Sequence, residues 1–459
     1  MFIRVFRYNY IKFDPMLIRF TVENFLSFNQ ETEFNMLTGE VRRLPNHVFS
    51  FSKVDLLKSA VIYGANGAGK SNLVTAINVL RHIILDKTVN YIPEDSYFRL
   101  DQNEDKPTTF EIEFLSGKNG YAYGISVYKS AIVEEWMFKL NFGKKPDDII
   151  FERKLKKGGQ ESLKMGDKYS KTPEDKILIK VYEDILEADK PFLTTVKEKK
   201  FKEIQDARHW LETGMFIIFP RMHFSGLVNN FLNDDRFKSF TNELICNLET
   251  GIKEIDVQTI DFDLYFGEDN SAEKDRVLKK IRGGESESVG DFKNALAMIE
   301  GGKPVVKKPV SYHADPNGKK VKFELYEESD GTLRLIDFIP LLFLIKNYQV
   351  TVIIDEIDQS IHPSLLKEFV TKIQNDSERF GQLIFTTHES NLLDLDLFRQ
   401  DEIWFAEKSK GCSSQFYVLS DYDVRTDFDI RKGYLSGRFG AIPFLGNLKD
   451  LKWGQYVEE

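Results

Sequence analysis

The chain has 459 residues, of which 42% are hydrophobic and 29% charged, and its formal net charge is −9. This length predicts two structural units, the composition excludes a disordered protein, and the acidic balance excludes a global field that attracts nucleic acid. Two distant cysteines predict neither a disulfide framework nor a zinc site. Because no apolar run approaches the ~18 residues of a spanning helix, we expect a cytoplasmic protein without membrane contact.

The first 15 residues, MFIRVFRYNYIKFDP, lack the continuous apolar core and the cleavage site of a secretory signal. An alternating segment at 17–22 follows Met16 and predicts a strand, and a second alternating run at 31–36 predicts its partner. We therefore interpret Met16 as the natural start and residues 1–15 as an upstream extension.

A phosphate-binding loop is predicted within the segment 59–80, SAVIYGANGAGKSNLVTAINVL, which contains the pattern G-x-x-x-x-G-K-[ST]. An apolar strand at 60–63 precedes the loop and a helix at 72–81 follows it. Glycines let several backbone N–H groups face a phosphate, Lys70 supplies charge to the β- and γ-phosphates, and the Ser71 hydroxyl suits Mg²⁺. The predicted cradle consists of Asn66, Gly67, Ala68, Gly69, Lys70, Ser71 and Asn72.

The next segments predict an antiparallel sheet and then an insertion. Alternating runs at 109–114, 121–128 and 131–140 predict three strands. The composition becomes rich in Lys, Asp, Glu and Gly from about Gly143, and we expect a mainly helical insertion or lid at 144–310. Within it, the spacing of apolar residues predicts a helix at 231–248, and the charged stretch 261–304 predicts an exposed helical part. Its lysine blocks are typical of solvated faces, and a nucleic-acid or partner surface remains open.

A helix N-terminus in the last third predicts a second anion site. Ser329 is a suitable N-cap for a helix that runs through Leu342, and the backbone around Gly331 would present N–H groups beside the helix dipole.

Two buried strands then carry polar residues at their ends. The apolar run 350–354 ends in Asp355 and Glu356, where Asp355 would hold Mg²⁺ and Glu356 would orient and deprotonate water. Solvated acids at a strand end are the alternative, and the preceding phosphate loop weighs against it. The strand at 382–388 ends in His388, which we expect to reach the γ-phosphate.

With these four elements in order, the chain resembles ABC-type ATPases of the SMC, DNA-recombination and OLD-like branch. More narrowly, it resembles the ATPase subunits of AbiL-type and PARIS-type abortive-infection systems in phage defence. The resemblance covers 16–140 and 320–445 and leaves the middle largely unmatched. The stretches that carry it are IRFTVENFLSF at 18–28, VIYGANGAGKSNL at 61–73, ESDGTLRL at 328–335, IIDEIDQSIHPSLL at 353–366, LIFTTHESNLLD at 383–394 and KGYLSGRFGAIPF at 432–444.

The resemblance implies an α/β fold. We expect an ABC-type P-loop ATPase head, with a mixed sheet, flanking helices and an antiparallel β subdomain. Residues 16–143 and 311–459 would form its two halves, on either side of the insertion 144–310.

The resemblance also implies a role for each motif residue. The catalytic residues would be Glu356, His388 and Lys70, and the Mg²⁺ ligands would be Ser71 and Asp355. Ser329 and Gly331 would reach the ATP of a second protomer, and Asp358 would lie at the dimer interface. The family's Q-loop glutamine has no clear counterpart, and Gln102 is the candidate.

The implied function is an ATP- and Mg²⁺-dependent homodimer, with the option of a higher homo-oligomer. Such a subunit would sense a phage protein or nucleic acid and control a separate effector, a nuclease, since few residues follow His388. A DNA-repair or chromosome-maintenance ATPase that binds DNA directly is the alternative. A third interpretation makes the chain itself a nuclease through Asp394 and Asp396, whose D-x-D spacing suits metal-dependent cleavage.

Overall fold

The computed structural model describes residues 16–51, 53–143, 145–155, 161–223, 226–248, 250–267, 271–290, 295–425 and 428–441. They divide into two compact units. The P-loop unit comprises the described residues of 16–217 and 382–441, and the signature unit those of 218–381. The predicted extension 1–15 lies outside the described residues, and the predicted domain boundaries at 143 and 310 stay a prediction.

The P-loop unit is built mainly from strands. Its strands are β1 (Met16–Glu23), β2 (Thr32–Asn35), β3 (Val48–Ser50), β4 (Asp55–Leu57), β5 (Ser59–Gly64), β6 (Thr108–Ser116), β7 (Asn119–Tyr128), β8 (Ala131–Leu140), β9 (Asp148–Leu155), β10 (Glu161–Met165), β18 (Gln382–Thr386), β19 (Ile403–Lys408) and β20 (Ser414–Val418), while β11 (Met215–Ile218) ends at the unit boundary. Its helices are α1 (Lys70–Asp86), α2 (Pro173–Ile185), α3 (Phe192–Thr195), α4 (Lys202–Thr213) and α11 (Ile430–Leu435).

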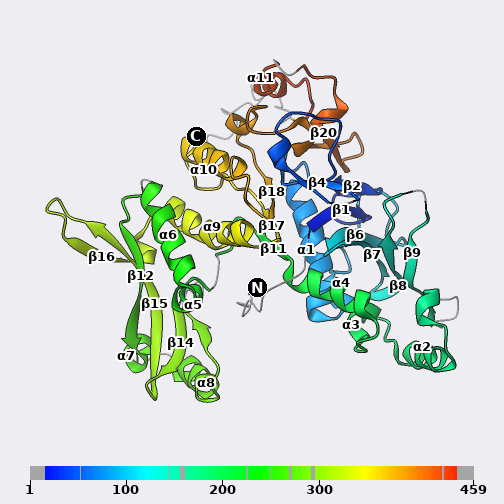
Figure 1. The fold of residues 1–459 in the computed structure, drawn as a ribbon, viewed down its shortest axis with the longest axis horizontal. Coiled ribbons are helices and arrows are strands. Elements are labelled where there is room, and N and C mark those ends of the chain that lie inside the picture. Colours follow the sequence, from blue (N-terminus) through cyan, green and yellow to red (C-terminus); the bar gives the residue numbers. More distant parts are fainter. Residues whose placement is uncertain are drawn as a thin grey trace, which may run out of the picture. The chain divides into compact units, whose positions relative to one another are not determined.

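A seven-stranded antiparallel sheet runs in the order β10-β9-β8-β7-β6-β1-β2 (Figure 1). The alternation that predicts strands before residue 143 places one face of β6 in the interior. Helix α4 packs on this sheet through Trp210, which stacks on Phe114 with ring centroids 4.3 Å apart. The predicted antiparallel β subdomain is therefore present.

A second sheet of this unit is mixed and carries the phosphate loop. Strand β5 pairs in parallel with β18 and β19, and β20 pairs antiparallel with β19. Every residue of β5 is buried, as expected for a central parallel strand. Gln382 joins the two sheets, because its side chain accepts from Leu17 N (2.7 Å) and donates to Leu57 O (3.2 Å).

A buried ion pair fixes the chain between α2 and α3 to the large sheet. Glu135 on β8 accepts from the backbone N–H groups of Phe192 (2.7 Å) and Leu193 (3.0 Å). Arg153 on β9 lies 3.6 Å from the same carboxylate and donates to the carbonyls of Glu187 and Lys190. Both charged side chains are fully buried, so each depends on the other for compensation.

We predict that Arg153→Met lowers the free energy of unfolding by roughly 3–5 kcal/mol at neutral pH, because the Glu135 carboxylate is then buried without its cation. Urea unfolding measures this loss. Burial already raises the pKa of Glu135 above its ordinary 4.5. A raised pKa in the folded state means that folding favours the protonated acid, so the loss should shrink as the pH falls toward 4.5.

The matched control for this prediction is Lys154→Met, on the same strand. Lys154 pairs with Glu134 at 3.3 Å in an exposed position, and losing such a pair costs about 0–1 kcal/mol. An equal effect of the two substitutions would contradict the role given to Arg153.

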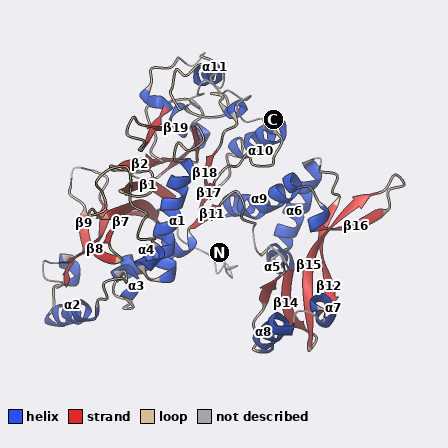
Figure 2. Ribbon diagram, turned by 180° about the vertical axis from the view of Figure 1, so that it is seen from behind, coloured by secondary structure: helices blue, strands red, loops and turns tan. Residues whose placement is uncertain are grey.

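The signature unit combines a five-stranded antiparallel sheet with helices. Its elements are α5 (Leu227–Asn233), α6 (Asp235–Asn247), β12 (Glu254–Asp261), α7 (Phe262–Phe266), α8 (Ser271–Arg282), β13 (Glu287–Val289), β14 (Ala295–Glu300), β15 (Lys303–Ala314), β16 (Lys320–Glu324), α9 (Asp330–Asn347), β17 (Thr351–Ile354) and α10 (Pro363–Gln374). The sheet order is β12-β15-β14-β13, and β16 pairs with β15 (Figure 2).

The segment 144–310 contains more strand than the sequence predicts. Besides helices α2 to α8, it includes strands β9 to β14 and most of β15, so it is mixed rather than simply helical. The stretch 261–304, predicted as helical, contains α7 and α8 but also β13 and β14. Prolines usually argue against a central strand, yet β15 carries Pro304 and Pro309 and lies between β12 and β14.

The single helix predicted at 231–248 is two helices. Asp234 has an extended backbone, and its carboxylate accepts from the N–H groups of Arg236 and Phe237. This N-cap ends α5 and starts α6, since an Asp at such a position satisfies the free donors of a new helix.

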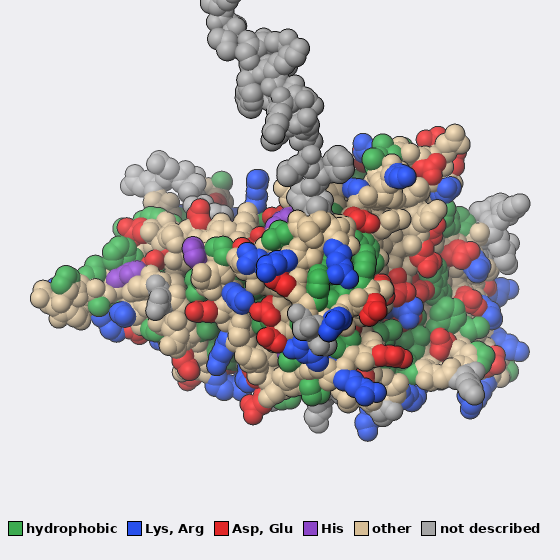
Figure 3. Space-filling view, turned by 90° about the horizontal axis from the view of Figure 1, so that it is seen from above, with side chains coloured by type: hydrophobic (Ala, Val, Ile, Leu, Met, Phe, Trp, Pro, Cys, Tyr) green, Lys and Arg blue, Asp and Glu red, His purple; other side chains and the backbone are tan. Residues whose placement is uncertain are grey.

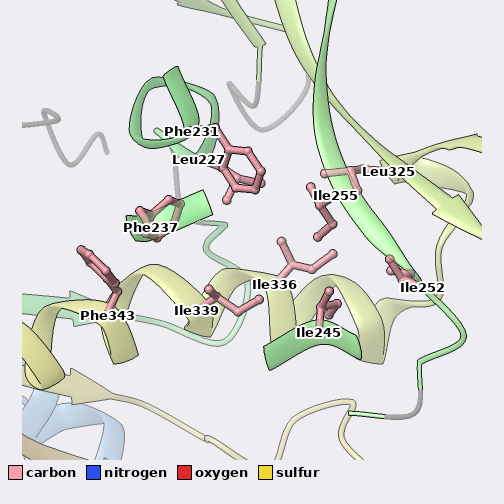
Figure 4. Packing of buried hydrophobic residues seen from close by; sticks show 10 residues of the cluster. All are labelled: Leu227, Phe231, Phe237, Ile245, Ile252, Ile255, Leu325, Ile336, Ile339 and Phe343. Carbon is pink, nitrogen blue, oxygen red and sulfur yellow. The ribbon is translucent and has the colours of Figure 1, made fainter. Parts of the chain in front are cut away.

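Helix α9 is anchored by an apolar cluster (Figure 4). Ile336, Ile339 and Phe343 point from α9 toward side chains of α5 and α6. Phe343 makes edge-on ring contacts with Phe237 and Phe240, at centroid distances of 5.2 and 5.5 Å. The helix that begins at the predicted second anion site, with Ser329 and Gly331, is thus packed against helices α5 and α6 of the insertion.

The architecture confirms the α/β fold class: a mixed sheet, flanking helices and an antiparallel β subdomain. Within the described residues, no helix has the length and apolar character needed to span a membrane.

Candidate functional site

The phosphate loop is a tight turn between β5 and α1. Gly69 caps α1 with φ at 108°, and Gly67 has φ at 77°, both in the left-handed region that favours glycine. A Cβ on Gly69 would overlap the Ser414 side chain, whereas one on Gly67 would meet nothing within 4 Å. Asn66 and Gly67 are exposed at the tip of the loop, while Ala68 and Gly69 are buried.

Two serines outside the motif stabilise the loop through hydrogen bonds. Ser414 Oγ donates to Ala68 O (2.6 Å) and lies 2.8 Å from Ser27 Oγ. Asn72 donates to Ser27 Oγ (2.7 Å). The phosphate-loop motif gives no indication of Ser414, which lies on β20. The only sequence signal for Ser27 is its place in IRFTVENFLSF, one of the stretches that carry the family resemblance.

Lys70 and His388 lie side by side next to the loop. Lys70 is 4% exposed, and its Nζ donates to Gly64 O (2.6 Å) and Ala65 O (3.3 Å). The same Nζ lies 3.2 Å from Nε2 of His388, which is exposed at the end of β18. Because an ammonium group can only donate, Nε2 accepts and the ring proton lies on Nδ1.

We predict that Gly69→Ala abolishes nucleotide binding, since the new Cβ is strained and overlaps Ser414. The matched control, Gly67→Ala, has the strain without the overlap and should keep measurable binding. Fluorescence titration with a labelled ATP analogue compares the two variants, and thermal unfolding shows whether each is folded. Equal losses would mean that the Ser414 contact does not determine the loop's shape.

The acidic pair lies directly after β17 in the signature unit. Asp355 is 1% exposed, and its backbone N–H donates to Ile218 O (2.9 Å). Glu356 has φ at 50° and is partly exposed. A left-handed backbone at a non-glycine residue costs about 1–3 kcal/mol and is common at functional sites.

The N-terminus of α9 lies against the turn that follows the acidic pair. Ser329 is the N-cap, and its hydroxyl accepts from Thr332 N (3.2 Å). A Cβ on Gly331 would lie 2.6 Å from Ser360 O, so only glycine fits this approach. Asp358 belongs to the same turn, and its carbonyl accepts from Ile361 N (3.3 Å).

Arg334 is a site residue that sequence analysis missed. Its side chain donates to the carbonyls of Phe219 (3.3 Å) and Met222 (3.2 Å), and its Nε and Nη2 lack hydrogen-bond partners within the described part of the chain. Burial lowers the pKa of its guanidinium, and three carboxylates oppose this shift, those of Asp337, Asp355 and Glu356. Arg334 therefore carries a largely buried positive charge near the acidic pair.

The predicted residues form two groups. The P-loop unit brings together Lys70, His388 and the loop with Ser71 and Asn72, and the signature unit brings together Asp355, Glu356, Ser329, Gly331 and Asp358. The roles given to these residues, including the Mg²⁺ pair Ser71 and Asp355, stay predictions.

Gln102 and the D-x-D pair have local roles. Gln102 is exposed, and its backbone N–H donates to the Asp101 carboxylate. The Asp394 carboxylate accepts from Asp396 N (3.0 Å), as in an ordinary turn, and Asp396 pairs with Arg43 (2.6 Å).

The family model described as "AAA domain, putative AbiEii toxin, Type IV TA system" matches residues 59–179 and 201–394, well over half of the chain. The chain belongs to this family. It is thus a P-loop ATPase-family protein, in agreement with the coarser part of the predicted resemblance. The model match includes the phosphate loop, the α9 N-terminus, the acidic pair and His388.

Among curated proteins, none matches the chain. Similar solved structures include the "SMC head domain from Thermotoga maritima", at 13% identity and a TM-score of 0.38, covering 88% of this chain and 98% of that chain. An Smc head bound to the C-winged helix domain of ScpA has 12% identity, a TM-score of 0.41 and coverages of 88% and 97%. An Smc head with an extended coiled coil, bound to the C-terminal domain of ScpA derived from Pyrococcus furiosus, has 13% identity, a TM-score of 0.41 and coverages of 93% and 99%. The assignment of the chain rests on the family model.

Proposed function

We propose that the protein binds and hydrolyses ATP with Mg²⁺, as the ATPase subunit of an abortive-infection complex in phage defence. The observation that carries this proposal is the contact between Lys70 Nζ and His388 Nε2 at the exposed loop. It unites two motifs that are 318 positions apart in sequence.

The residues of the loop fit a nucleotide phosphate. Its tip is exposed, its glycines allow the required backbone angles, and α1 begins directly behind it, so N–H groups and a helix dipole favour an anion. Lys70 would hold the β- and γ-phosphates, and Ser71 and Asp355 would hold Mg²⁺, which neutralises the charge that develops on the phosphates.

Each catalytic side chain would have one task. Lys70 would exchange its contacts with Gly64 O and Ala65 O for phosphate oxygens. Glu356 would orient a water molecule and accept its proton. His388 would sense the terminal phosphate, because binding there removes Lys70 from its Nε2.

We predict that Glu356→Gln keeps ATP binding and lowers turnover by at least about 100-fold, since an amide cannot accept the proton. Lys70→Ala should instead lose binding. Phosphate release and analogue titration distinguish the two variants. Full hydrolysis by Glu356→Gln would remove the role given to this carboxylate.

We further propose that ATP joins two copies of the chain head to tail, with Ser329 and Gly331 of one copy completing the site of the other. Ser329→Asp tests this arrangement. Aspartate is as good an N-cap as serine, but its charge repels the γ-phosphate, and Ser329→Asn keeps the cap without the charge.

When Ser329→Asp and Lys70→Ala proteins are mixed, only the heterodimer has an intact site, formed by Lys70 of the first protein and Ser329 of the second, so ATPase activity that neither protein shows alone should appear in the mixture. Ser329→Asn should be active alone. No recovery, with both single variants inactive, would indicate a site completed within one chain.

The role in defence rests on the family description and on the coupling of α9 to the insertion. That description names an AbiEii toxin and a toxin–antitoxin system, and we propose for this chain a related role in the cytoplasm, controlling a separate nuclease in response to a phage protein or nucleic acid. The cluster in Figure 4 would transmit movement between α9 and helices α5 and α6. Cleavage of DNA or tRNA by the purified chain alone would overturn the separate effector.

A DNA-repair ATPase is the second candidate, and the lysine blocks motivate it. Several of these lysines are already paired, as Lys154 is with Glu134 and Lys200 with Asp175. On the face drawn in Figure 3, basic and acidic side chains are interspersed. ATP-stimulated, salt-dependent binding to DNA by the isolated protein would favour this candidate.

A further inference from the structure

Helix α2 exposes a stripe of large aliphatic side chains. Ile177, Val181 and Ile185 are 65%, 48% and 52% exposed. They are spaced by four residues and therefore line one face of the helix over about 12 Å. We call this surface the α2 stripe.

The opposite side of α2 is firmly attached to the P-loop unit. Tyr182 makes edge-on contacts with the rings of Phe192 and Phe201, and Glu183 accepts from Leu163 N on β10 (2.8 Å). A capping box between Thr172 and Asp175 fixes the first turn. These contacts set the rotation of the helix, which packs beside β10, and leave the stripe exposed. Figure 1 shows α2 at the edge of the P-loop unit.

A groove lies next to the stripe. It has a volume of about 440 Å³. Its lining combines Leu178, Val181, Ile185 and Thr194 with the charged side chains of Lys87, Glu187, Lys190, Lys197 and Glu198. A space of this size can receive aliphatic side chains from another helix.

Two charged residues at one edge of the stripe indicate what covers it. Lys180 and Asp184 are both exposed, and neither forms an ion pair or a side-chain hydrogen bond with another described residue. They are one turn apart, so both follow the same edge of the stripe. In a parallel two-fold pair, Lys180 and Asp184 of one copy would lie at the opposite edge of the contact from those of the other copy, so they could not pair across it. An antiparallel pair would place each Lys180 at the level of the other copy's Asp184.

We propose that the α2 stripe binds the α2 stripe of a second copy, antiparallel and about a two-fold axis near Val181 and Tyr182. This arrangement buries the three aliphatic side chains against their equivalents and gives two Lys180–Asp184 pairs. Such an isologous contact satisfies the same patch on both copies. It does not involve ATP and is distinct from the nucleotide-linked dimer proposed above.

The contact should be weak when it acts alone. One helix pair buries less than the about 1,200–2,000 Å² of a standard interface. Self-association is therefore measured by sedimentation over a wide range of protein concentration, in Lys70→Ala protein without nucleotide, which prevents the ATP-dependent dimer from forming. Failure of the ATP proposals leaves this measurement unaffected.

We predict that this nucleotide-free protein approaches twice its 53.3 kDa mass as concentration rises. Val181→Asp should weaken the association at least about tenfold, because a carboxylate would be buried in an apolar contact. Leu264→Asp is the matched control, because Leu264 is 77% exposed in the signature unit, and it should have no effect.

The charge exchange is the decisive test. Lys180→Asp and Asp184→Lys should each weaken association, and the double variant should restore it, because the antiparallel pairs are re-formed with reversed sign. Failure of the double variant to recover would overturn the antiparallel arrangement.

A cross-linking experiment detects the contact even when it is weak. Val181→Cys, in protein whose exposed Cys246 and Cys412 are replaced by serine, should form a disulfide-linked dimer, since the two thiols meet near the axis. A Cys at Lys168, which lies outside α2, should not. A protein that stays monomeric and forms no link at position 181 would overturn the proposal. A second outcome would also overturn the proposal: the protein stays monomeric, and Val181→Asp nevertheless removes defence activity. The stripe would then bind a different protein.

Discussion

The burial of Lys70 is the constraint on which the candidate site depends. A lysine that is 4% exposed needs acceptors, and it finds them in Gly64 O, Ala65 O and His388 Nε2. The loop can offer its carbonyls because Gly69 adopts a backbone that other residues avoid and because Ser414 fixes the carbonyl of Ala68. Strands β5, β18 and β20 thus cooperate to hold one amino group beside the exposed tip of the loop.

In the signature unit, the equivalent constraint is the packing of α9. Its N-terminus carries Ser329 and Gly331, and its apolar face enters the cluster formed with α5 and α6. Arg334 follows the N-terminus of α9 in sequence, and its positive charge is attracted by the carboxylates of Asp355 and Glu356. Since a packed core responds to strain as a body rather than residue by residue, a shift of the insertion helices would move the signature residues and Arg334 together. The charge balance at Asp355 and Glu356 would change with that movement.

The sequence predicts the loop, the acidic strand and His388 because each of them is defined by a few residues that are adjacent in the chain. Ser414 and Arg334 escaped because their importance comes from contacts with residues distant in sequence, such as Ala68 and Met222. Apolar and polar residues alternate in β12, as is typical of a strand. Its acidic residues made this segment resemble the charged, exposed part of the insertion. Prolines such as Pro304 and Pro309 usually argue against a central strand, yet in β15 they lie opposite Ile299 of β14 and Val257 of β12. Asp234 is a residue type that favours an N-cap. The apolar spacing continues across α5 and α6, so the sequence predicts one helix where the structure has two.

The two proposed self-contacts of the chain have a joint consequence. A chain with a single two-fold contact can form only a dimer, whereas a chain with two different two-fold contacts forms a closed assembly of even number or an open series. If ATP makes one contact and the α2 stripe the other, each ATP-bound dimer would present two stripes. When two such dimers close into a tetramer, the first stripe contact places the second at a high effective concentration, so a weak contact between α2 helices would suffice to join them. Because Glu135 and Arg153 fix the segment after α2 to the large sheet, the orientation of that contact would follow the sheet of the P-loop unit.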